Sequence, residues 1–290
     1  MLTPKKSLGQ NFLIDRGIAR RIVDAVAPNR EDLIIEIGPG TGALTRSLVE
    51  RAGKVIAIEI DHRLAAELRE SINTQNFALV EGDALTIDFA QLALEGMHET
   101  SPSAAASQAI PLKRTRAVAN LPYYVSTPII ERLLLAGRSH AAGGGTFDDL
   151  TLMLQKEVVD RMTSGPGGKL YGYLSVLVAF YSEASRLFDV PPQAFKPVPK
   201  VDSSVVRLRV LKRPAIEVAD QNQFFEFVKA AFAQRRKTIL NNLRHSAQRL
   251  RFSQPPELAL ARAAIDPSRR AETLSLKEFG TLFAELLSNR

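Results

Sequence analysis

A glycine-rich loop is the first feature of the sequence that could do chemistry. Glu36-Ile37-Gly38-Pro39-Gly40-Thr41-Gly42 follows an apolar run and precedes a helical pattern at residues 43–51. Glycines at such a junction let a ligand approach the backbone closely, and the following helix offers its first amides to negative groups. The loop therefore predicts a nucleotide-like ligand. Gly38, Gly40 and Ala43 also satisfy the dinucleotide pattern G-x-G-x-x-G/A, so the loop alone leaves the ligand open.

Two acidic residues follow the loop at the ends of later predicted strands. Glu59 comes 21 residues after Gly38, where a carboxylate can accept hydrogen bonds from both ribose hydroxyls. Asp83 ends the third strand, where a carboxylate can accept from the exocyclic amine of an adenine, although such a residue taken alone more often caps a turn. The loop, Glu59 and Asp83 together predict a nucleoside site along one edge of a parallel sheet.

The tetrapeptide Asn120-Leu121-Pro122-Tyr123 ends the fourth predicted strand and suits the methylation of an exocyclic amine. The lone pair of such an amine is delocalised into the base, so the nitrogen must become tetrahedral before it attacks a methyl group. Acceptors around its N–H groups favour that change. Asn120 Oδ1 and the Leu121 carbonyl could supply them, while Tyr123 would stack on the base. The structural alternative is that Asn120 caps a turn and Tyr123 fills a gap.

The composition excludes several other kinds of chemistry. The sequence has no cysteine, which removes disulfides, thiolate metal sites and cysteine nucleophiles. Its four histidines have no ligand-like spacing, so we expect no metal. The longest stretch without a charged side chain, residues 117–130, has fourteen residues and is too short for a membrane span. Since the first residues also lack a secretory signal, we expect a cytoplasmic protein without membrane contact.

The charge is unevenly distributed along the chain. Residues 1–210 hold 24 basic and 23 acidic side chains, whereas residues 211–290 hold 14 and 8, within a net charge of +7. This basic segment is typical of a polyanion-binding surface such as one for nucleic acid, although a solubilising surface would have the same charge. Its sharpest cluster, Arg235, Arg236 and Lys237, is expected to contact phosphates unless it is only a solvated helix start.

The pattern of apolar residues predicts two domains. Over residues 32–210, short β-branched runs at 33–37, 54–58, 77–80, 117–119 and 150–154 alternate with helical patterns, which favours an α/β fold with a parallel sheet. Runs at 187–190 and 204–210 would close the sheet, the second as an antiparallel strand.

Beyond Pro214 the apolar residues repeat with helical spacing instead, as in Phe224, Phe227, Val228, Ala231 and Phe232 and again over residues 279–287. We therefore expect a catalytic domain over residues 1–211 and a helical, basic RNA-binding domain over 212–290. We interpret residues 95–108 as a surface insertion and residues 143–145 as a flexible joint.

These motifs occur together in one known family. The sequence resembles the adenine-N6 dimethyltransferases of ribosomal RNA, in particular those that modify two neighbouring adenosines near the 3′ end of small-subunit rRNA. The likeness runs nearly end to end, through KKSLGQNFL (5–13), EIGPGTG (36–42), GDAL (82–85), NLPY (120–123), QKEV (155–158), FKPVPKVDS (195–203) and residues 232–240.

The resemblance implies a Rossmann-like methyltransferase sheet that uses S-adenosylmethionine and no metal, with a small all-helical C-terminal domain that helps to hold structured RNA. The substrate would be rRNA of the immature small ribosomal subunit, methylated to N6,N6-dimethyladenosine by a monomeric enzyme. The implied cofactor contacts are Gln10, Asn11, Leu13, Gly38, Gly40, Glu59, Asp83 and Asn120.

The target base is implied to lie against Asn120, Leu121 and Tyr123, with Phe195 stacked on its other face. Without the resemblance, Phe195 would be interpreted as a core anchor for a Pro-rich loop. The sequence departs from the family pattern at Tyr124, where many relatives carry Asn, and in the length of the 95–108 insertion.

Three alternative functions stay open from the sequence. A large-subunit rRNA adenine dimethyltransferase shares the catalytic motifs and differs in its RNA. A ribosome-assembly checkpoint protein would depend on RNA binding more than on methylation. A nicotinamide-dependent dehydrogenase is permitted by the glycine loop, but the sequence offers no candidate acid or base for hydride transfer.

Overall fold

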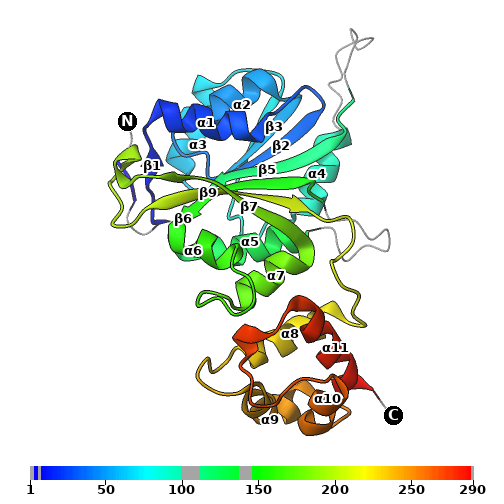
Figure 1. Cartoon of the computed structure of the whole chain (residues 1–290). Coiled ribbons are helices and arrows are strands. Elements are labelled where there is room, and N and C mark those ends of the chain that lie inside the picture. The colour runs from blue at the N-terminus through cyan, green and yellow to red at the C-terminus, as the bar shows by residue number, and fades with distance from the viewer. Residues whose placement is uncertain (1–2, 6–7, 99–110, 137–145, 289–290) are drawn as a thin grey trace. The chain divides into compact units, whose positions relative to one another are not determined.

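A computed structural model describes residues 3–5, 8–98, 111–136 and 146–288, and it divides into two compact units (Figure 1). The first unit combines Met1–Val159 with Glu183–Arg213, and the second combines Asp160–Ser182 with Pro214–Arg290. The division after residue 213 lies close to the predicted boundary. The expected catalytic span of residues 1–211 needs a correction, however, because residues 160–182 belong to the helical unit.

Seven strands form the main sheet of the first unit, in the order β4-β3-β2-β5-β6-β9-β7. Parallel pairs join β2 to β3, β2 to β5, β3 to β4 and β5 to β6, whereas β9 runs antiparallel to β6. The predicted α/β class is therefore confirmed. The strands are β2 (Asp32–Ile37), β3 (Lys54–Glu59), β4 (Phe77–Glu81), β5 (Arg114–Asn120), β6 (Asp149–Gln155), β7 (Ser182–Val190) and β9 (Ser203–Val210).

Helices cover both faces of this sheet (Figure 1). On one face, Ile34 and Val55 belong to a buried cluster with side chains of α1 (Arg16–Val26), α2 (Thr45–Arg51) and α3 (His62–Ser71). The neighbouring residues Leu33 and Ile56 point to the opposite face, because side chains alternate along a strand. There they pack against α4 (Phe89–His98), and a Cβ built on Gly96 would lie 2.7 Å from Ile56 Cδ1. Helix α5 (Ser126–Leu135) follows β5.

A short ribbon outside the main sheet joins the N-terminal segment, which comprises the residues before α1, to the Pro-rich loop at residues 191–200. Strand β1 (Phe12–Leu13) pairs antiparallel with β8 (Phe195–Lys196), and the Ile14 amide donates to the Ala194 carbonyl at 2.8 Å. The residues before Phe12 are thereby held near the carboxyl ends of the sheet strands, where Phe12 lies against Gly40.

The second unit is helical and is built around aromatic rings. The ring of Phe180 on α7 stacks on Phe224 at 5.3 Å between centroids, and Phe224 and Phe227 contact Phe283 at 5.4 and 5.6 Å. These contacts explain why residues 160–182 belong here, since α7 supplies part of the core. The helices wholly within this unit are α7 (Tyr173–Tyr181), α8 (Gln221–Ala231), α9 (Ile239–Leu250), α10 (Pro256–Arg262) and α11 (Leu276–Leu287).

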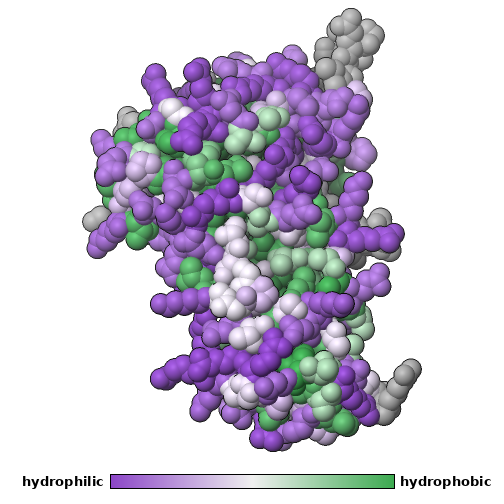
Figure 2. Space-filling view, in the orientation of Figure 1, coloured by the Kyte–Doolittle hydropathy of each residue, from purple (hydrophilic) through white to green (hydrophobic). Residues whose placement is uncertain are grey.

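The predicted surface insertion overlaps regular structure at its start. Residues 95–98 form the last turn of α4, because Ala93 and Gly96 are buried against the sheet. Residues 99–108 and the predicted joint at 143–145 lie outside the described residues. Hydrophilic side chains dominate the visible surface of each unit, with small apolar areas between them (Figure 2). None of the described helices is long and apolar enough to span a membrane.

A buried ion network lies at the amino ends of the strands. Arg116 on β5, whose side chain is 3% exposed, donates to Asp32 on β2 at 3.2 Å and to Asp149 on β6 at 3.0 Å. Arg114 and Arg207 complete the network from its edges, pairing with Asp32 and Asp149 respectively. The network ties three neighbouring strands together at the edge opposite their carboxyl ends.

We expect Arg116→Ala to lower the free energy of unfolding by about 3–5 kcal/mol, because it leaves two buried carboxylates without their shared cation. Lys113→Ala is the matched control, because Lys113 pairs with Glu31 on the exposed surface. This change should lower the free energy of unfolding by less than about 1 kcal/mol. Urea unfolding followed by circular dichroism measures both. Equal losses in the two variants would contradict the assignment of a structural role to the buried network.

Candidate active site

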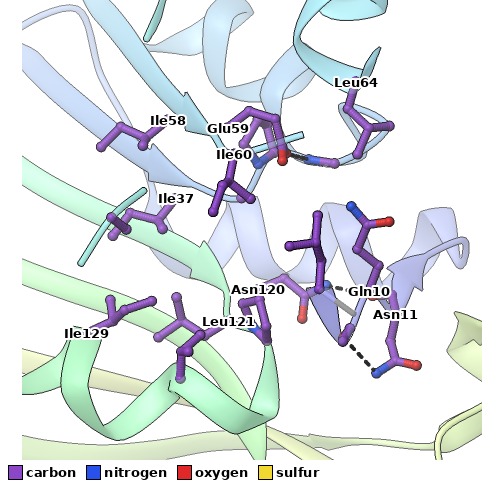
Figure 3. Close-up of a pocket in the computed structure, with 18 of the residues that line it drawn as sticks. Gln10, Asn11, Ile37, Ile58, Glu59, Ile60, Leu64, Asn120, Leu121 and Ile129 are labelled. Atoms are coloured by element: carbon purple, nitrogen blue, oxygen red, sulfur yellow. Dashed lines mark hydrogen bonds between the residues drawn. The ribbon is translucent and has the colours of Figure 1, made fainter. Parts of the chain in front are cut away.

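A cavity of about 230 Å³ lies at the carboxyl ends of the parallel strands. Its wall comes from the N-terminal segment, the loops after β2, β3 and β4, and the loop after β5. In Figure 3, Gln10 lies across the cavity from Ile58, with Glu59 and Asn120 at opposite sides of the opening between them. Since β2 stands where the sheet order reverses, this is the position at which open α/β sheets bind ligands.

The glycine loop forms one wall through backbone conformations that favour glycine. Gly38 and Gly40 have φ values of +66° and +59°. These lie in the left-handed region, which residues other than glycine rarely adopt. The Gly38 amide donates to the Ile58 carbonyl at 2.9 Å, which joins the loop to β3. A Cβ on Gly40 would lie 3.2 Å from the ring of Phe12, so a glycine here lets the N-terminal segment close on the loop.

Glu59 links the glycine loop to the start of α3. Its carboxylate accepts from the Gly40 amide at 3.1 Å and from the Asp61 amide at 2.9 Å. The side chain is buried, and desolvation raises its pKa above the ordinary value despite these two bonds. Glu59 is thus held rigidly at the cavity wall, at the position predicted for a ribose contact.

Asp83 lines the same cavity after β4 and also shapes its own turn. Its Oδ1 accepts from the Leu85 amide at 2.9 Å. The turn-forming interpretation and the ligand-binding interpretation are therefore compatible, because one carboxylate oxygen is used within the turn while the residue remains part of the wall.

Glu36 is a cavity residue to which the sequence analysis assigned no role. It lies at the end of β2, is 2% exposed, and its Oε2 has no hydrogen-bond partner within the described residues. Desolvation by burial raises its pKa to about 8. An acidic residue inside an otherwise apolar strand, Leu33 to Ile37, was the available signal. The cavity therefore contains a buried acceptor suited to a cationic or hydrogen-donating ligand group.

The N-terminal segment is held across the cavity by the Asp61 carboxylate. Lys5 Nζ and Gln10 Nε2 donate to it at 3.1 and 3.2 Å. Arg63 on α3 makes a bidentate contact, donating from Nε and Nη2 to the two carboxylate oxygens. These donors keep the pKa of Asp61 well below its ordinary value, with Arg63 the largest cause. The side chain of Gln10 accordingly links the N-terminal segment to Asp61, while the residue lines the cavity.

Asn120 connects the N-terminal segment to the loop that follows β5. Its Nδ2 donates to the Asn11 carbonyl at 3.1 Å. Only the nitrogen of the amide can donate to a carbonyl, so this contact fixes which way the amide is turned. Oδ1 is thereby presented as an acceptor, as the predicted role in methyl transfer requires. Next to it, the Leu121 amide donates to Met153 on β6 at 3.2 Å and holds the loop on the sheet.

Tyr123 is fixed at its hydroxyl end. The hydroxyl forms a hydrogen bond of 2.8 Å with Ser203 Oγ at the start of β9. Burial raises the pKa of the Tyr123 hydroxyl, so the group stays protonated at neutral pH. A half-buried aromatic ring with its end anchored is a suitable wall for a planar base.

Phe195 does not lie where the resemblance implied. It is 1% exposed and belongs to the buried cluster with Leu13 and Ala194, and it is absent from the cavity wall. The pairing of β8 with β1 draws its side chain into this core. The structure therefore corrects the stacking role to that of a core anchor for the Pro-rich loop.

The basic cluster at 235–237 lies in the second unit, in the loop between α8 and α9. The Arg235 side chain already has partners within that unit, since it donates to the Lys169 carbonyl at 2.7 Å and to Glu272 at 2.9 Å. Arg236 and Lys237 are exposed, and their side chains have no ion pair within the described part of the chain. Of the three predicted phosphate contacts, these two are the ones available to a ligand.

The cavity thus gathers the predicted residues from distant parts of the chain, and their individual roles stay predictions. Among the described residues, no group of three His, Asp or Glu side chains could hold a metal ion. The predicted residues in the cavity wall are Gln10, Asn11, Leu13, Gly38, Gly40, Glu59, Asp83, Asn120, Leu121 and Tyr123.

Comparison with known proteins decides the family. The model of the ribosomal RNA adenine dimethylases matches residues 1–286. The chain belongs to this family. It is 46% identical over 283 residues to ribosomal RNA small subunit methyltransferase A of Moorella thermoacetica, covering 97% of the chain and 92% of the relative. The protein of the same name from Shouchella clausii is 44% identical over 287 residues, covering 99% and 90%.

Two solved structures of enzymes named as methyl or dimethyladenosine transferases share the fold. A dimethyladenosine transferase from Plasmodium falciparum is 26% identical, with a TM-score of 0.72 over 94% of this chain and 96% of the other. The 23S rRNA methyltransferase ErmE is 28% identical, with a TM-score of 0.65 over 95% and 99%. The chain is thus an rRNA adenine dimethyltransferase by family, and the resemblance identified from its motifs is confirmed.

Glu36 predicts a pH dependence of stability that its replacement should remove. The pKa of Glu36 is about 8 in the folded chain, above the ordinary value of 4.5. Between pH 4.5 and about 8, the folded state therefore keeps a proton that the unfolded state has released. The contribution of Glu36 to the unfolding free energy should fall as pH rises through this window, by up to about 1.4 kcal/mol per pH unit.

Glu36→Gln should therefore gain stability relative to the wild type as pH rises from 5 to about 8, in urea unfolding at a series of pH values. Glu67→Gln, the same change on the exposed side of α3, is the matched control and should follow the wild-type profile. Parallel profiles for the wild type and Glu36→Gln would show that Glu36 is ionised in the folded chain.

Proposed function

We propose that the protein transfers methyl groups from S-adenosylmethionine to the N6 amines of two adjacent adenosines near the 3′ end of small-subunit rRNA during ribosome maturation. The observation that carries this proposal is the position of Asn120. Its amide is turned by the Asn11 carbonyl so that Oδ1 is the acceptor, within the same cavity as the glycine loop and Glu59. One cavity thus offers contacts for both a nucleoside cofactor and a base amine.

The buried carboxylates favour S-adenosylmethionine over a dinucleotide. The unpartnered Oε2 of Glu36 and the buried Glu59 lie in the wall beside the glycine loop. The pyrophosphate of a dinucleotide would place two negative charges beside these acidic groups and oppose their ionisation, whereas a cationic ligand would favour their ionised forms. S-adenosylmethionine instead carries a positive sulfonium and an ammonium group, so the donor set fits this cofactor. When bound, it supplies an electrophilic methyl group.

The residues of the chain would act on the amine rather than on its proton. As the N6 nitrogen becomes tetrahedral, its N–H groups would donate to Asn120 Oδ1 and to the Leu121 carbonyl, and these bonds strengthen as charge develops. Tyr123 would hold the plane of a base taken out of its stack. No side chain needs to remove a proton before transfer, because the nitrogen becomes acidic only once it is methylated.

The choice of the small subunit rests on the relatives. Those at 44–46% identity over nearly the full chain are named small subunit methyltransferases, whereas the 23S rRNA methyltransferase is 28% identical. The similarity of that enzyme's fold makes large-subunit rRNA the second candidate substrate. The two candidates share the chemistry and differ in the RNA.

Mapping the methylated nucleotides separates these substrates. The protein is incubated with methyl-labelled S-adenosylmethionine and with unmodified small or large ribosomal subunits, and the label is located in the rRNA. We expect two labelled adjacent adenosines near the 3′ end of the small-subunit rRNA. Label confined to the large-subunit rRNA would favour the second candidate, and the absence of label from both would overturn the proposal.

Asn120→Ala should reduce single-turnover methyl transfer by at least about 100-fold, the loss typical for removing one group that stabilises a transition state. Cofactor affinity, measured by calorimetry, should fall by less than about fivefold, because only one neutral hydrogen bond to the Asn11 carbonyl is lost. Near-normal transfer by a folded variant would return Asn120 to a purely structural role.

The basic loop of the second unit predicts a salt dependence. Replacing both Arg236 and Lys237 by Gln should flatten the slope of log K for RNA binding against log salt by nearly two units, one for each phosphate contact. The double change of Arg244 and Arg249 to Gln removes the same charge from exposed residues paired with Glu257 and Glu226, and should leave the slope unaltered. Equal slopes in all three proteins would show that RNA binds elsewhere.

A further inference from the structure

An exposed aromatic ring beside the cavity has no role in the mechanism above. Tyr124 follows Tyr123 in the short 3₁₀ turn η2 (Tyr123–Val125), and both residues line the cavity. Tyr123 is partly buried with its hydroxyl on Ser203, whereas Tyr124 is 61% exposed. Its position at the cavity leaves an aromatic face on which a planar group could pack.

The ring of Tyr124 is supported along one edge by the N-terminal segment. Gly9 has a φ of +57°, and a Cβ built on it would lie only 2.9 Å from Tyr124 Cδ1 and 3.1 Å from Cε1. The glycine therefore lets the ring edge rest on the backbone. The segment under the ring is itself held two residues further on, where the Asn11 carbonyl accepts from Asn120. Tyr124 is thus an exposed ring on a fixed support.

A supported, solvent-exposed ring at the edge of a base-binding cavity has a specific use in RNA recognition. Bases stack on aromatic side chains, and this contact tolerates any base because every base has a π face. When a target base leaves its stack and enters the cavity, it no longer covers the bases on either side of it. The face of a neighbouring base that had packed against the target is then uncovered. Tyr124 adjoins the residue that would hold the target, so it lies where such a neighbour would emerge.

We propose that Tyr124 stacks on the base of the nucleotide adjoining the target adenosine, and thereby helps to hold the RNA strand at the entrance of the cavity. This inference rests on the proposed function, since it requires an adenosine in the cavity. Tyr124 would act on RNA capture and leave the methyl-transfer step alone.

The competing role for Tyr124 is to hold the N-terminal segment in place, since its ring lies on Gly9. The two roles differ in what they depend on. A stacking ring depends on the presence of a neighbouring base in the RNA. A ring that only supports the segment affects cofactor binding and is indifferent to that base.

The test compares variants of Tyr124 on RNA substrates that have, or lack, the base next to the target. Small ribosomal subunits are assembled with unmethylated rRNA, and methyl transfer is scored at one of the two adjacent adenosines alone. The rRNA is intact or carries an abasic nucleotide on the 5′ or the 3′ side of that adenosine. Wild type, Tyr124→Ala, Tyr124→Leu and Tyr124→Phe are compared by KM and kcat for the subunits and by calorimetry with S-adenosylmethionine. Leu keeps an apolar contact with Gly9 without a π face, and Phe keeps the face without the hydroxyl.

On intact subunits we expect Tyr124→Ala and Tyr124→Leu to raise KM by about 5- to 150-fold, the range for one lost base stack, with kcat and cofactor affinity unchanged. Tyr124→Phe should behave like the wild type. On one of the two abasic substrates, all four proteins should have the same raised KM.

Two results would overturn the proposal. One is a Tyr124→Ala effect of the same size on the intact and both abasic substrates, and the other is a loss of cofactor affinity that accounts for the whole effect. If the wild type methylates no adenosine in intact subunits but binds S-adenosylmethionine, the proposed function fails, and the stacking role fails with it.

Discussion

The parallel pairing of β2 with β3 on one side and with β5 on the other is the constraint on which the rest of the site depends. In this pairing the three strands end at the same edge of the sheet, with Ile37 opposite Ile58 and Ala119. The loops that follow must therefore start side by side. Glu59 and Asn120, 61 positions apart in the chain, become walls of one cavity because a few backbone hydrogen bonds fix the register of the strands.

The charges of the first unit are sorted between the two edges of this sheet. At the amino edge, Asp32 and Asp149 share the buried guanidinium of Arg116. At the carboxyl edge, Glu36 and Glu59 are also buried but pair with no cationic side chain among the described residues, and desolvation raises the pKa of both. The first edge is electrostatically complete, while the second holds acidic groups whose ionised forms a positively charged molecule would stabilise.

Much of this arrangement could be predicted from the sequence, for a physical reason. Gly38, Glu59, Asp83 and Asn120 each follow an apolar run, and the alternation of strands and helices determines that such ends share an edge. Local patterns carry that information. Three-dimensional packing does not follow from them, which is why the contact of Arg235 with Glu272 was missed. Phe195 is buried as its sequence context alone had indicated, and the exposed stacking position came only from the resemblance. Both side chains are defined by partners far away in the chain, as are Lys5 and Gln10 around Asp61.

The helical unit is made from two pieces of chain that are separated by two strands of the sheet, and this affects the order in which it can fold during synthesis. Helix α7 emerges from the ribosome with Phe180 and Tyr181, whose aromatic partners on α8, Phe224 and Phe225, lie about 45 residues further along. At about 5–20 residues per second, the nascent chain carries these two rings without their α8 partners for about 2–9 seconds. Over that interval the apolar side chains of α7 are open to premature association, and a chain truncated after residue 213 would never supply their α8 partners.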